Sequence, residues 1–227
     1  MTLEKEKNKM SKLAGLSGDK NLSIMEIIEK FDYLKVVFKY IINNNTSNNA
    51  PYHNLNHLMT VTRAVYEGMN AEGLGDESLM KEMLIAAFFH DFNHSAGKLS
   101  DDKNIENAKK GLKKFLEEED VEVNLNFMES VIDATQYPYV IEESDLNEYQ
   151  KIIRDADLMQ VIQYNYVHQC IHGLSEELGI PFEKFIESQK KFIDGAKFNT
   201  KWGNKIKQDN WERVEKEVEV LLEIFKK

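Results

Sequence analysis

Cysteine, proline and arginine are scarce in this sequence of 227 residues. It contains one cysteine, Cys170, and three prolines, which excludes a disulfide-stapled scaffold and a collagen-like chain. A lone thiol has no partner for an internal bridge, so the fold does not depend on an oxidising compartment. Arginine occurs only at Arg63, Arg154 and Arg213. Because forked guanidinium clamps are therefore few, a phosphate bound by this chain is expected to need a metal ion.

Long apolar runs and a surplus of positive charge are also missing. No stretch approaches the roughly 18 consecutive apolar residues of a membrane span. Residues 1–21 are polar and lack the apolar centre of a signal peptide. The formal net charge is −10, whereas binding to a nucleic-acid backbone needs a basic stripe that displaces counterions. We therefore expect a cytoplasmic protein with neither a membrane nor a nucleic-acid backbone as its partner.

What is present is the pattern of one helical domain. Residues 1–21 have no sustained periodicity, which predicts a flexible or marginally helical lead-in to a single domain over residues 22–227. Ser23 and Glu26 form a capping-box pair at the start of a helix that runs to Ile41. Apolar residues at 3–4 spacing predict further helices at about 55–71, 77–90, 102–119, 124–135, 147–163, 164–178, 182–198 and 205–226. Strand patterns are lacking apart from a short stretch at 121–125, so we predict a compact all-α bundle.

Two of these helices have distinctive patterns. The segment Lys81–Phe89 is apolar nearly all round, which predicts a helix buried on several sides at the centre of the domain. The last helix has a single apolar face. That face packs either on the domain or on a second subunit of an oligomer, and the sequence leaves both arrangements open.

Four of the six histidines fall in two short clusters, and this concentration is the main chemical signal. His53 and His57 lie in PYHNLNH, and His90 and His94 lie in HDFNH. His90 and Asp91 follow the most apolar helix, where an unpaired carboxylate costs on the order of several kcal/mol unless a cation or strong donors compensate. A metal ion would supply that compensation.

A third element is the stretch Arg154–Asp157, near the start of a predicted helix. Two residues apart on a helix, Asp155 and Asp157 point about 200° away from each other, so only one of them can face a given site. Imidazole and carboxylate ligands suit one or two divalent ions such as Mn, Mg, Zn, Fe or Ni. The single cysteine excludes a thiolate site.

The order of these residues resembles that of the HD-domain metal-dependent phosphohydrolases. Within that superfamily, PYHNLNH followed by HDFNH is similar to the catalytic domains of class I cyclic-nucleotide phosphodiesterases, whose pattern is YHN-x-x-H and then HD-x-x-H. Ile105–Asn107 is similar to their Leu-Glu-Asn stretch, and Glu187–Asp194 to their Ser-Gln-x-x-Phe-Ile-Asp block. The resemblance covers about residues 51–194 with shorter intervening segments, and Ser95-Ala96 stands where the family has Pro-Gly.

The resemblance implies an HD-type helical bundle with a metal centre. Its implied metal ligands are His57, His90, Asp91 and Asp157, with Asp91 bridging to a second ion. Asp157 is preferred to Asp155 because the family's ligand aspartate often follows a small residue, as it does here after alanine.

The same family pattern assigns roles to other residues of the motifs. His53 matches the general acid, and His94 matches the histidine that supports the second metal and its bridging water. Together with Asp91 they form the implied catalytic set. The residues expected to contact the nucleotide are Tyr52, Gln189 and Phe192. The residues expected behind the metal ligands are Asn54 and Asp155, the latter alternatively paired with Arg154.

The implied activity is cleavage of a nucleotide phosphoester, cyclic nucleotides included. The family uses hydroxide from a metal-activated water, and a protonated His53 would serve the leaving oxygen. Two alternatives stay open. Some HD proteins bind two irons and activate dioxygen, and others would keep the site to bind a nucleotide as a sensor without turnover. Retention of His53 disfavours the sensor, because binding alone needs no proton donor.

Overall fold

Residues 22–226 are described by the computed structural model, and every regular element within them is a helix. The expected lead-in at residues 1–21 lies outside the described residues, as does Lys227. The helices are α2 (Ile24–Lys30), α3 (Asp32–Asn44), α4 (Leu55–Ala71), α5 (Glu77–Phe89), α6 (Asp101–Glu118), α7 (Leu125–Asp133), η1 (Glu143–Asp145), α8 (Glu148–Leu158), η2 (Met159–Ile162), η3 (Val167–His172), α9 (Gly173–Glu177), α10 (Phe182–Gly195) and α11 (Lys201–Ile224). Their buried apolar side chains form one continuous core. The predicted all-α fold is confirmed.

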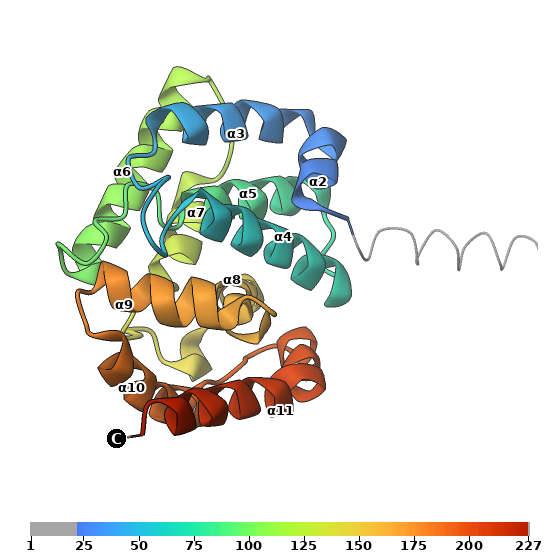
Figure 1. Ribbon diagram of the computed structural model, residues 1–227. Coiled ribbons are helices and arrows are strands. Elements are labelled where there is room, and N and C mark those ends of the chain that lie inside the picture. Colours follow the sequence, from blue (N-terminus) through green and yellow to red (C-terminus); the bar gives the residue numbers. More distant parts are fainter. Residues whose placement is uncertain (1–21, 227) are drawn as a thin grey trace, which may run out of the picture.

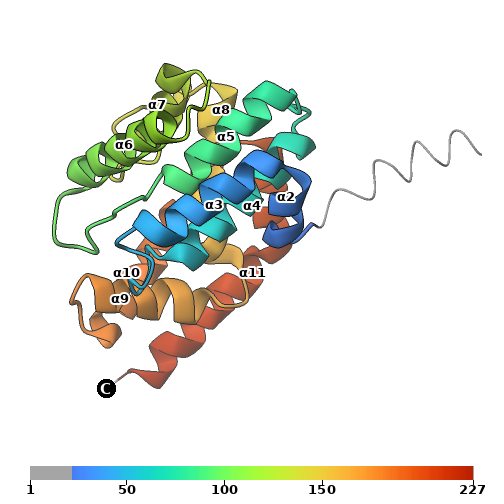
Figure 2. The same ribbon diagram turned by 90° about the horizontal axis from the view of Figure 1, so that it is seen from above.

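Helix α5 is the centre of this bundle. All side chains from Met83 to Phe89 are fully buried, as the all-round apolar pattern predicts. Helices α3, α4, α6 and α7 pack directly against α5. Helix α4 in turn contacts α8 and α11, so that α9, α10 and α11 lie on the opposite side of α4 from α3 (Figure 1; Figure 2 gives the view from above).

The predicted helix from Ser23 to Ile41 is interrupted at Phe31, and in this respect the prediction is wrong. Its capping box is present, with both Ser23–Glu26 hydrogen bonds formed. Phe31 has φ −120° and ψ 102°, which ends α2, and its ring packs 5.5 Å from that of Tyr33. Helix α2 covers α4 whereas α3 covers α5. One straight helix could not cover both surfaces, and the bend between α2 and α3 is visible in Figure 1.

The later helices are less regular than their apolar spacing predicts. Helix α8 passes into the 3₁₀ turn η2, and the segment predicted as a helix at 164–178 begins with the π-helical turn η3 before α9. Wide π turns are rare and frequently accompany functional sites. The stretch 121–125 forms no strand and leads into α7. Helix α10 ends at Gly195 and α11 begins at Lys201.

Asp155 fixes the start of α11. It is fully buried, and its carboxylate accepts hydrogen bonds from the backbone N–H groups of Asn199 and Thr200 at 2.7 and 2.8 Å. The side chains of the same two residues donate to it as well. The expectations that Asp155 lies behind the metal ligands or pairs with Arg154 are therefore wrong. Because it lies on the opposite side of α8 from Asp157, it holds the C-terminal segment on the domain.

The apolar side of α11 packs on the domain itself. Val214 and Val218 are buried. At the start of the helix, Trp202 lies so close to α4 that a Cβ on Gly68 would stand 2.9 Å from the indole ring. A glycine at position 68 is therefore needed for this close approach of the two helices.

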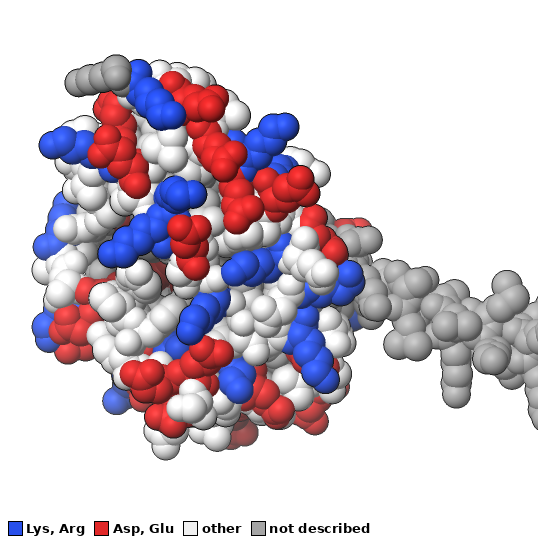
Figure 3. Space-filling model, turned by 90° about the horizontal axis from the view of Figure 1, so that it is seen from below, with Lys and Arg blue, Asp and Glu red and all other residues white. Residues whose placement is uncertain are grey.

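Acidic and basic side chains lie side by side on the surface. Figure 3 shows this intermixing on one face of the molecule, and along α11 the pairs Lys205–Asp209 and Arg213–Glu217 are one helical turn apart. Over the described range 22–226, no helix is both long enough and apolar enough to cross a membrane.

Replacing Asp155 tests the attachment of α11. Asp155→Ala leaves the donors of Asn199 and Thr200 without their acceptor, so we expect the free energy of unfolding to fall by about 3 kcal/mol. Urea denaturation followed by circular dichroism measures this loss. The matched control is Asp209→Ala, which removes an exposed carboxylate paired with Lys205 and should change stability by less than about 1 kcal/mol. Equal losses in the free energy of unfolding for the two variants would contradict the role of Asp155 in holding the start of α11.

Candidate metal centre

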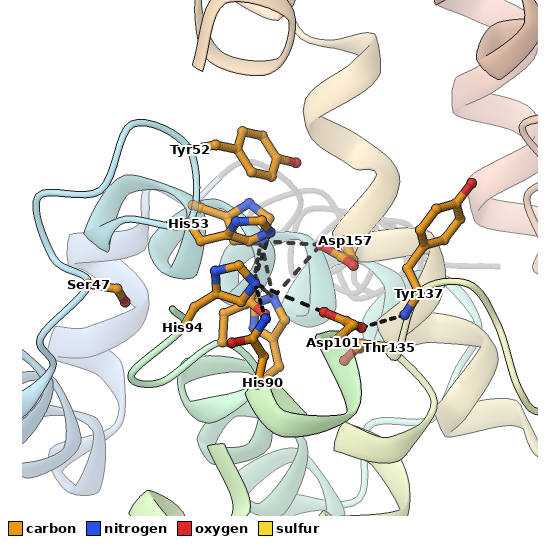
Figure 4. A network of polar contacts seen from close by, with 12 residues as sticks. Ser47, Tyr52, His53, His90, His94, Asp101, Thr135, Tyr137 and Asp157 are labelled. Atoms are coloured by element: carbon orange, nitrogen blue, oxygen red, sulfur yellow. Dashed lines mark hydrogen bonds and ion pairs between the residues drawn. The ribbon is translucent and has the colours of Figure 1, made fainter. Parts of the chain in front are cut away.

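Four side chains converge where α4, α5 and α8 meet: His57, His90, Asp91 and Asp157. Nε2 of His57 lies 3.1 Å from Nε2 of His90, 3.0 Å from Oδ2 of Asp91 and 3.2 Å from Oδ1 of Asp157. Ligand atoms about 2.1 Å from one ion lie about 3.0 Å apart at right angles and about 3.4 Å apart in a tetrahedron. The sequence-predicted ligands are therefore brought together at the spacing that one divalent ion requires. Figure 4 shows His90 and Asp157 approaching this point from different helices.

The outer ring nitrogens of the two histidines are held by acceptors. Nδ1 of His90 donates to the carbonyl oxygen of Ala87 at 2.8 Å, and Nδ1 of His57 donates to Oε1 of Gln160 at 2.5 Å. Each ring consequently turns Nε2 toward the other ligands. Contacts of this kind fix the tautomer and orientation of a metal-binding histidine. Gln160 was not among the residues expected here, although it follows Asp157 by three positions, a spacing that places both on one side of a helix.

Two asparagines hold the backbone next to the histidine motifs. Asn54 caps α4, because its Oδ1 accepts the backbone N–H of His57 at 3.1 Å. Asn93 has φ 58°, a left-handed conformation that asparagine tolerates better than most residues. Its Oδ1 accepts from the backbone N–H of Thr46 at 2.8 Å, while its own N–H donates to Asn45 at 2.7 Å. The loop that contains Asn45 and Thr46 and the HDFNH turn therefore hold each other in place.

The charges of the cluster depend on each other. Burial alone would lower the pKa of His57, but Asp157 and Asp91 outweigh it and raise the pKa to about 9. Asp91 shows the reverse: burial would raise its pKa, but His90, His53 and His57 hold it well below its usual range. The pKa of Asp157 is lowered by His57 and His90 against the same effect of burial. Two ionised carboxylates here need positive charge between them, which a proton or a metal ion supplies.

A second group, His53, Asp91 and His94, lies beside the first and shares Asp91 with it. Nε2 of His53 is 4.0 Å from Oδ2 of Asp91, and the rings of His53 and His94 face each other at a tilt of 32° with centroids 3.6 Å apart (Figure 4). Asn104 donates to Nε2 of His94 at 2.8 Å. Burial and the neighbouring His53 lower the pKa of His94 to about 4, so its ring is neutral. Nε2 of His94 could bind a second ion only if Asn104 released it. The two histidines of the first group instead use Nδ1 for their hydrogen bonds to protein acceptors and turn Nε2 toward the other ligands, which makes the first group the stronger candidate metal site.

Glu177, at the end of α9, is a residue of this site that the sequence motifs did not indicate. Its buried carboxylate accepts the backbone N–H groups of Tyr52 and His53 at 3.0 and 3.1 Å. It also forms a short hydrogen bond with Nδ1 of His53. Burial would raise the pKa of Glu177, but the contact with His53 holds it below its usual value. Because 124 positions separate Glu177 from His53, no local pattern could have revealed the pair.

The residues expected to contact a nucleotide do not form an open surface. Tyr52 is buried, with its ring edge-on to that of His53 at 4.7 Å. Gln189 is also buried, and its Oε1 accepts a hydrogen bond from the hydroxyl of Tyr166 at 2.9 Å. Phe192 packs on the core. The expectation that Gln189 reads a base is therefore wrong for this structure, and Tyr52 is a packing neighbour of His53. Phe192 is only partly buried, so its role in stacking a base stays a prediction.

Gln160 offers a test of the ligand geometry. Gln160→Leu removes the acceptor that orients His57, so we expect metal affinity to fall by about 10- to 100-fold while the fold is retained. Isothermal titration calorimetry with Mn²⁺ or Zn²⁺ measures the change. Gln163→Leu is the control, since Gln163 lines a surface cavity instead. Identical affinities of the two variants would show that the Gln160 contact does not orient a ligand.

The raised pKa of His57 leads to a second prediction. In protein stripped of metal by a chelator, a group with a pKa of about 9 carries a proton near neutral pH, and an ion that binds Nε2 has to displace it. We therefore expect metal binding near neutral pH to release protons and metal affinity to increase as the pH rises toward about 9. Calorimetry in buffers of different ionisation enthalpy detects this release. A binding heat that is independent of the buffer would contradict it.

No family model matches this chain, and no curated protein and no solved structure matches it either. The geometry of the two groups around Asp91 therefore carries the functional argument, together with the residues of the HD-like motifs.

Proposed function

We propose that this chain is a metal-dependent phosphohydrolase that cleaves a phosphoester of a nucleotide. The observation that carries the proposal is the position of His53, whose Nε2 lies 4.0 Å from Oδ2 of Asp91 while the buried Glu177 holds its Nδ1. A site that only bound a metal would need no such pair beside its ligands. A cyclic nucleotide is the substrate to which the motif resemblance points.

Each residue has a defined part in this reaction. The residues that would hold the ion are His57, His90, Asp91 and Asp157. When bound, a divalent ion polarises phosphoryl oxygens and makes a coordinated water acidic near neutral pH. With Nδ1 of His53 directed at Glu177, a protonated Nε2 faces the centre and donates to the leaving oxygen. Glu177 holds the ring in the orientation that presents Nε2 to the centre.

The arginines support a role for metal in meeting the phosphate charge. Arg154 donates to the carbonyl oxygens of Ala134 and Ile141. Arg213 donates to the carbonyl oxygen of Ile162 and pairs with Glu217, and Arg63 pairs with Glu67. All three arginines are thus engaged with protein groups, so the positive charge that binds an anionic substrate has to come from elsewhere.

The proposal predicts different effects for two substitutions at the centre. His53→Ala should retain the metal and slow kcat by about 10²- to 10⁴-fold, the usual contribution of a general acid. Asp91→Ala should lose both metal and activity, because Asp91 belongs to both groups of ligands. Protein loaded with Mn, Mg or Ni is assayed against a panel of nucleotides and cyclic nucleotides, with metal content measured by mass spectrometry. An unchanged rate in His53→Ala would remove the general-acid role.

The same assay distinguishes the alternatives. Failure to cleave any member of the panel while metal is bound overturns the hydrolase. Oxygen consumption with a mixed-valent diiron signal would identify an oxygenase instead. Nucleotide binding without turnover, unaffected by His53→Ala, would identify a sensor.

A further inference from the structure

The loop between α7 and η1 forms a fixed wall beside the metal centre. Arg154, only 3% exposed, holds both ends of this loop. Its Nε donates to the carbonyl oxygen of Ala134 at 2.6 Å, and its Nη2 donates to the carbonyl oxygen of Ile141 at 2.8 Å. The same guanidinium lies 4.0 Å from the ring centroid of Tyr139, a cation–π contact. Arg154 precedes Asp157 by three positions on α8, so one side of this helix carries both a metal ligand and the anchor of the wall.

Tyr137 occupies the exposed edge of this wall. Its ring meets that of Tyr139 edge to face, with centroids 5.5 Å apart and planes at 85°. Its backbone N–H donates to Oδ2 of Asp101 at 2.6 Å, and Oδ1 of Asp101 lies 4.0 Å from Nε2 of His94. In Figure 4 the Tyr137 side chain stands beyond Asp157 and Asp101, across the site from His53 and His94.

The Tyr137 ring is anchored but not covered. It is 60% exposed, although its neighbour and its backbone are both held. Because its backbone and its neighbour are already held, the open face of this ring could receive a planar group without rearrangement of the loop. The polar groups around it are the carboxylates of Asp101 and Asp157 (Figure 4), which favour an uncharged planar group on the ring over a second anion.

We propose that Tyr137 is the stacking platform for the nucleobase of the substrate, an inference that rests on the proposed nucleotide phosphohydrolase. In a mononucleotide only the sugar separates the base from the phosphate, so the surface that receives the base has to border the metal centre. The wall at Tyr137 does so, whereas Gln189 is buried and its Oε1 is occupied by the hydroxyl of Tyr166. Stacking accepts any base, since each has a planar face. Tyr139, which packs against the Arg154 guanidinium, fixes the orientation of the Tyr137 ring through their edge-to-face contact.

Equilibrium binding to the metal-loaded protein tests the platform. The ligands are AMP, GMP, CMP and UMP, with ribose 5-phosphate as the matched compound that lacks a base. We expect at least one nucleotide to bind more tightly than ribose 5-phosphate. Tyr137→Ala should weaken that nucleotide by at least about fivefold, the lower end of a base-stacking contact, and leave ribose 5-phosphate unchanged. Tyr137→Phe keeps the ring and should keep the affinity. The control is Tyr164→Ala, at an exposed tyrosine that stacks on Arg213 instead.

The outcomes separate this inference from the proposed function. Equal binding of the nucleotide by Tyr137→Ala and the unsubstituted protein overturns the platform, even if the protein cleaves nucleotides. An absence of nucleotide binding, or of any preference over ribose 5-phosphate, also overturns it. Nucleotide binding that depends on Tyr137 without any cleavage supports the platform and refutes the phosphohydrolase.

Discussion

The rest of this structure depends on the enclosure of two ionised carboxylates against two imidazoles at the junction of α4, α5 and α8. The rings of His57 and His90 are fully buried, and Nε2 of His57 reaches both Asp91 and Asp157 within 3.2 Å. Such a cluster is stable only with a cation or a shared proton at its centre. The surrounding residues hold the four side chains in this arrangement. Asn54 caps the start of α4 next to His57, and Gln160 orients the His57 ring. The left-handed turn at Asn93 sets the path of the backbone between His90 and His94.

The extent to which this arrangement could be predicted depends on how local each determinant is. Helix α5 and the capping box at Ser23 were predictable because each is encoded within one or two turns of chain. The candidate metal ligands were predictable because short motifs carry them. The break at Phe31 was not, because it follows from the packing of α2 and α3 on two different helices, α4 and α5. The contact of Glu177 with His53 could not be predicted either, because it joins segments that are far apart in the sequence.

The enclosed orientations of Gln189 and Asp155 show a limit of motif reasoning. Both residues have the chemistry that a binding role requires, a neutral amide and a carboxylate. Yet the amide of Gln189 accepts a hydrogen bond from Tyr166, and the carboxylate of Asp155 receives the donors of Asn199 and Thr200. A motif identifies residue types at a spacing, but the helix rotation that selects solvent or interior depends on the partners packed around it.

The four consecutive residues Arg154–Asp157 leave α8 little tolerance for change in length. In order along the helix they anchor the Tyr139 loop, hold the start of α11, fill the core and contribute a candidate metal ligand. Each residue turns the helix by about 100°. A single insertion in α8 before Arg154 would therefore rotate these four side chains out of their present surroundings. A change of length in the exposed turn between α9 and α10 would disturb none of them. Homologous chains that keep this chemistry should vary in length elsewhere and preserve the phase of this one helix.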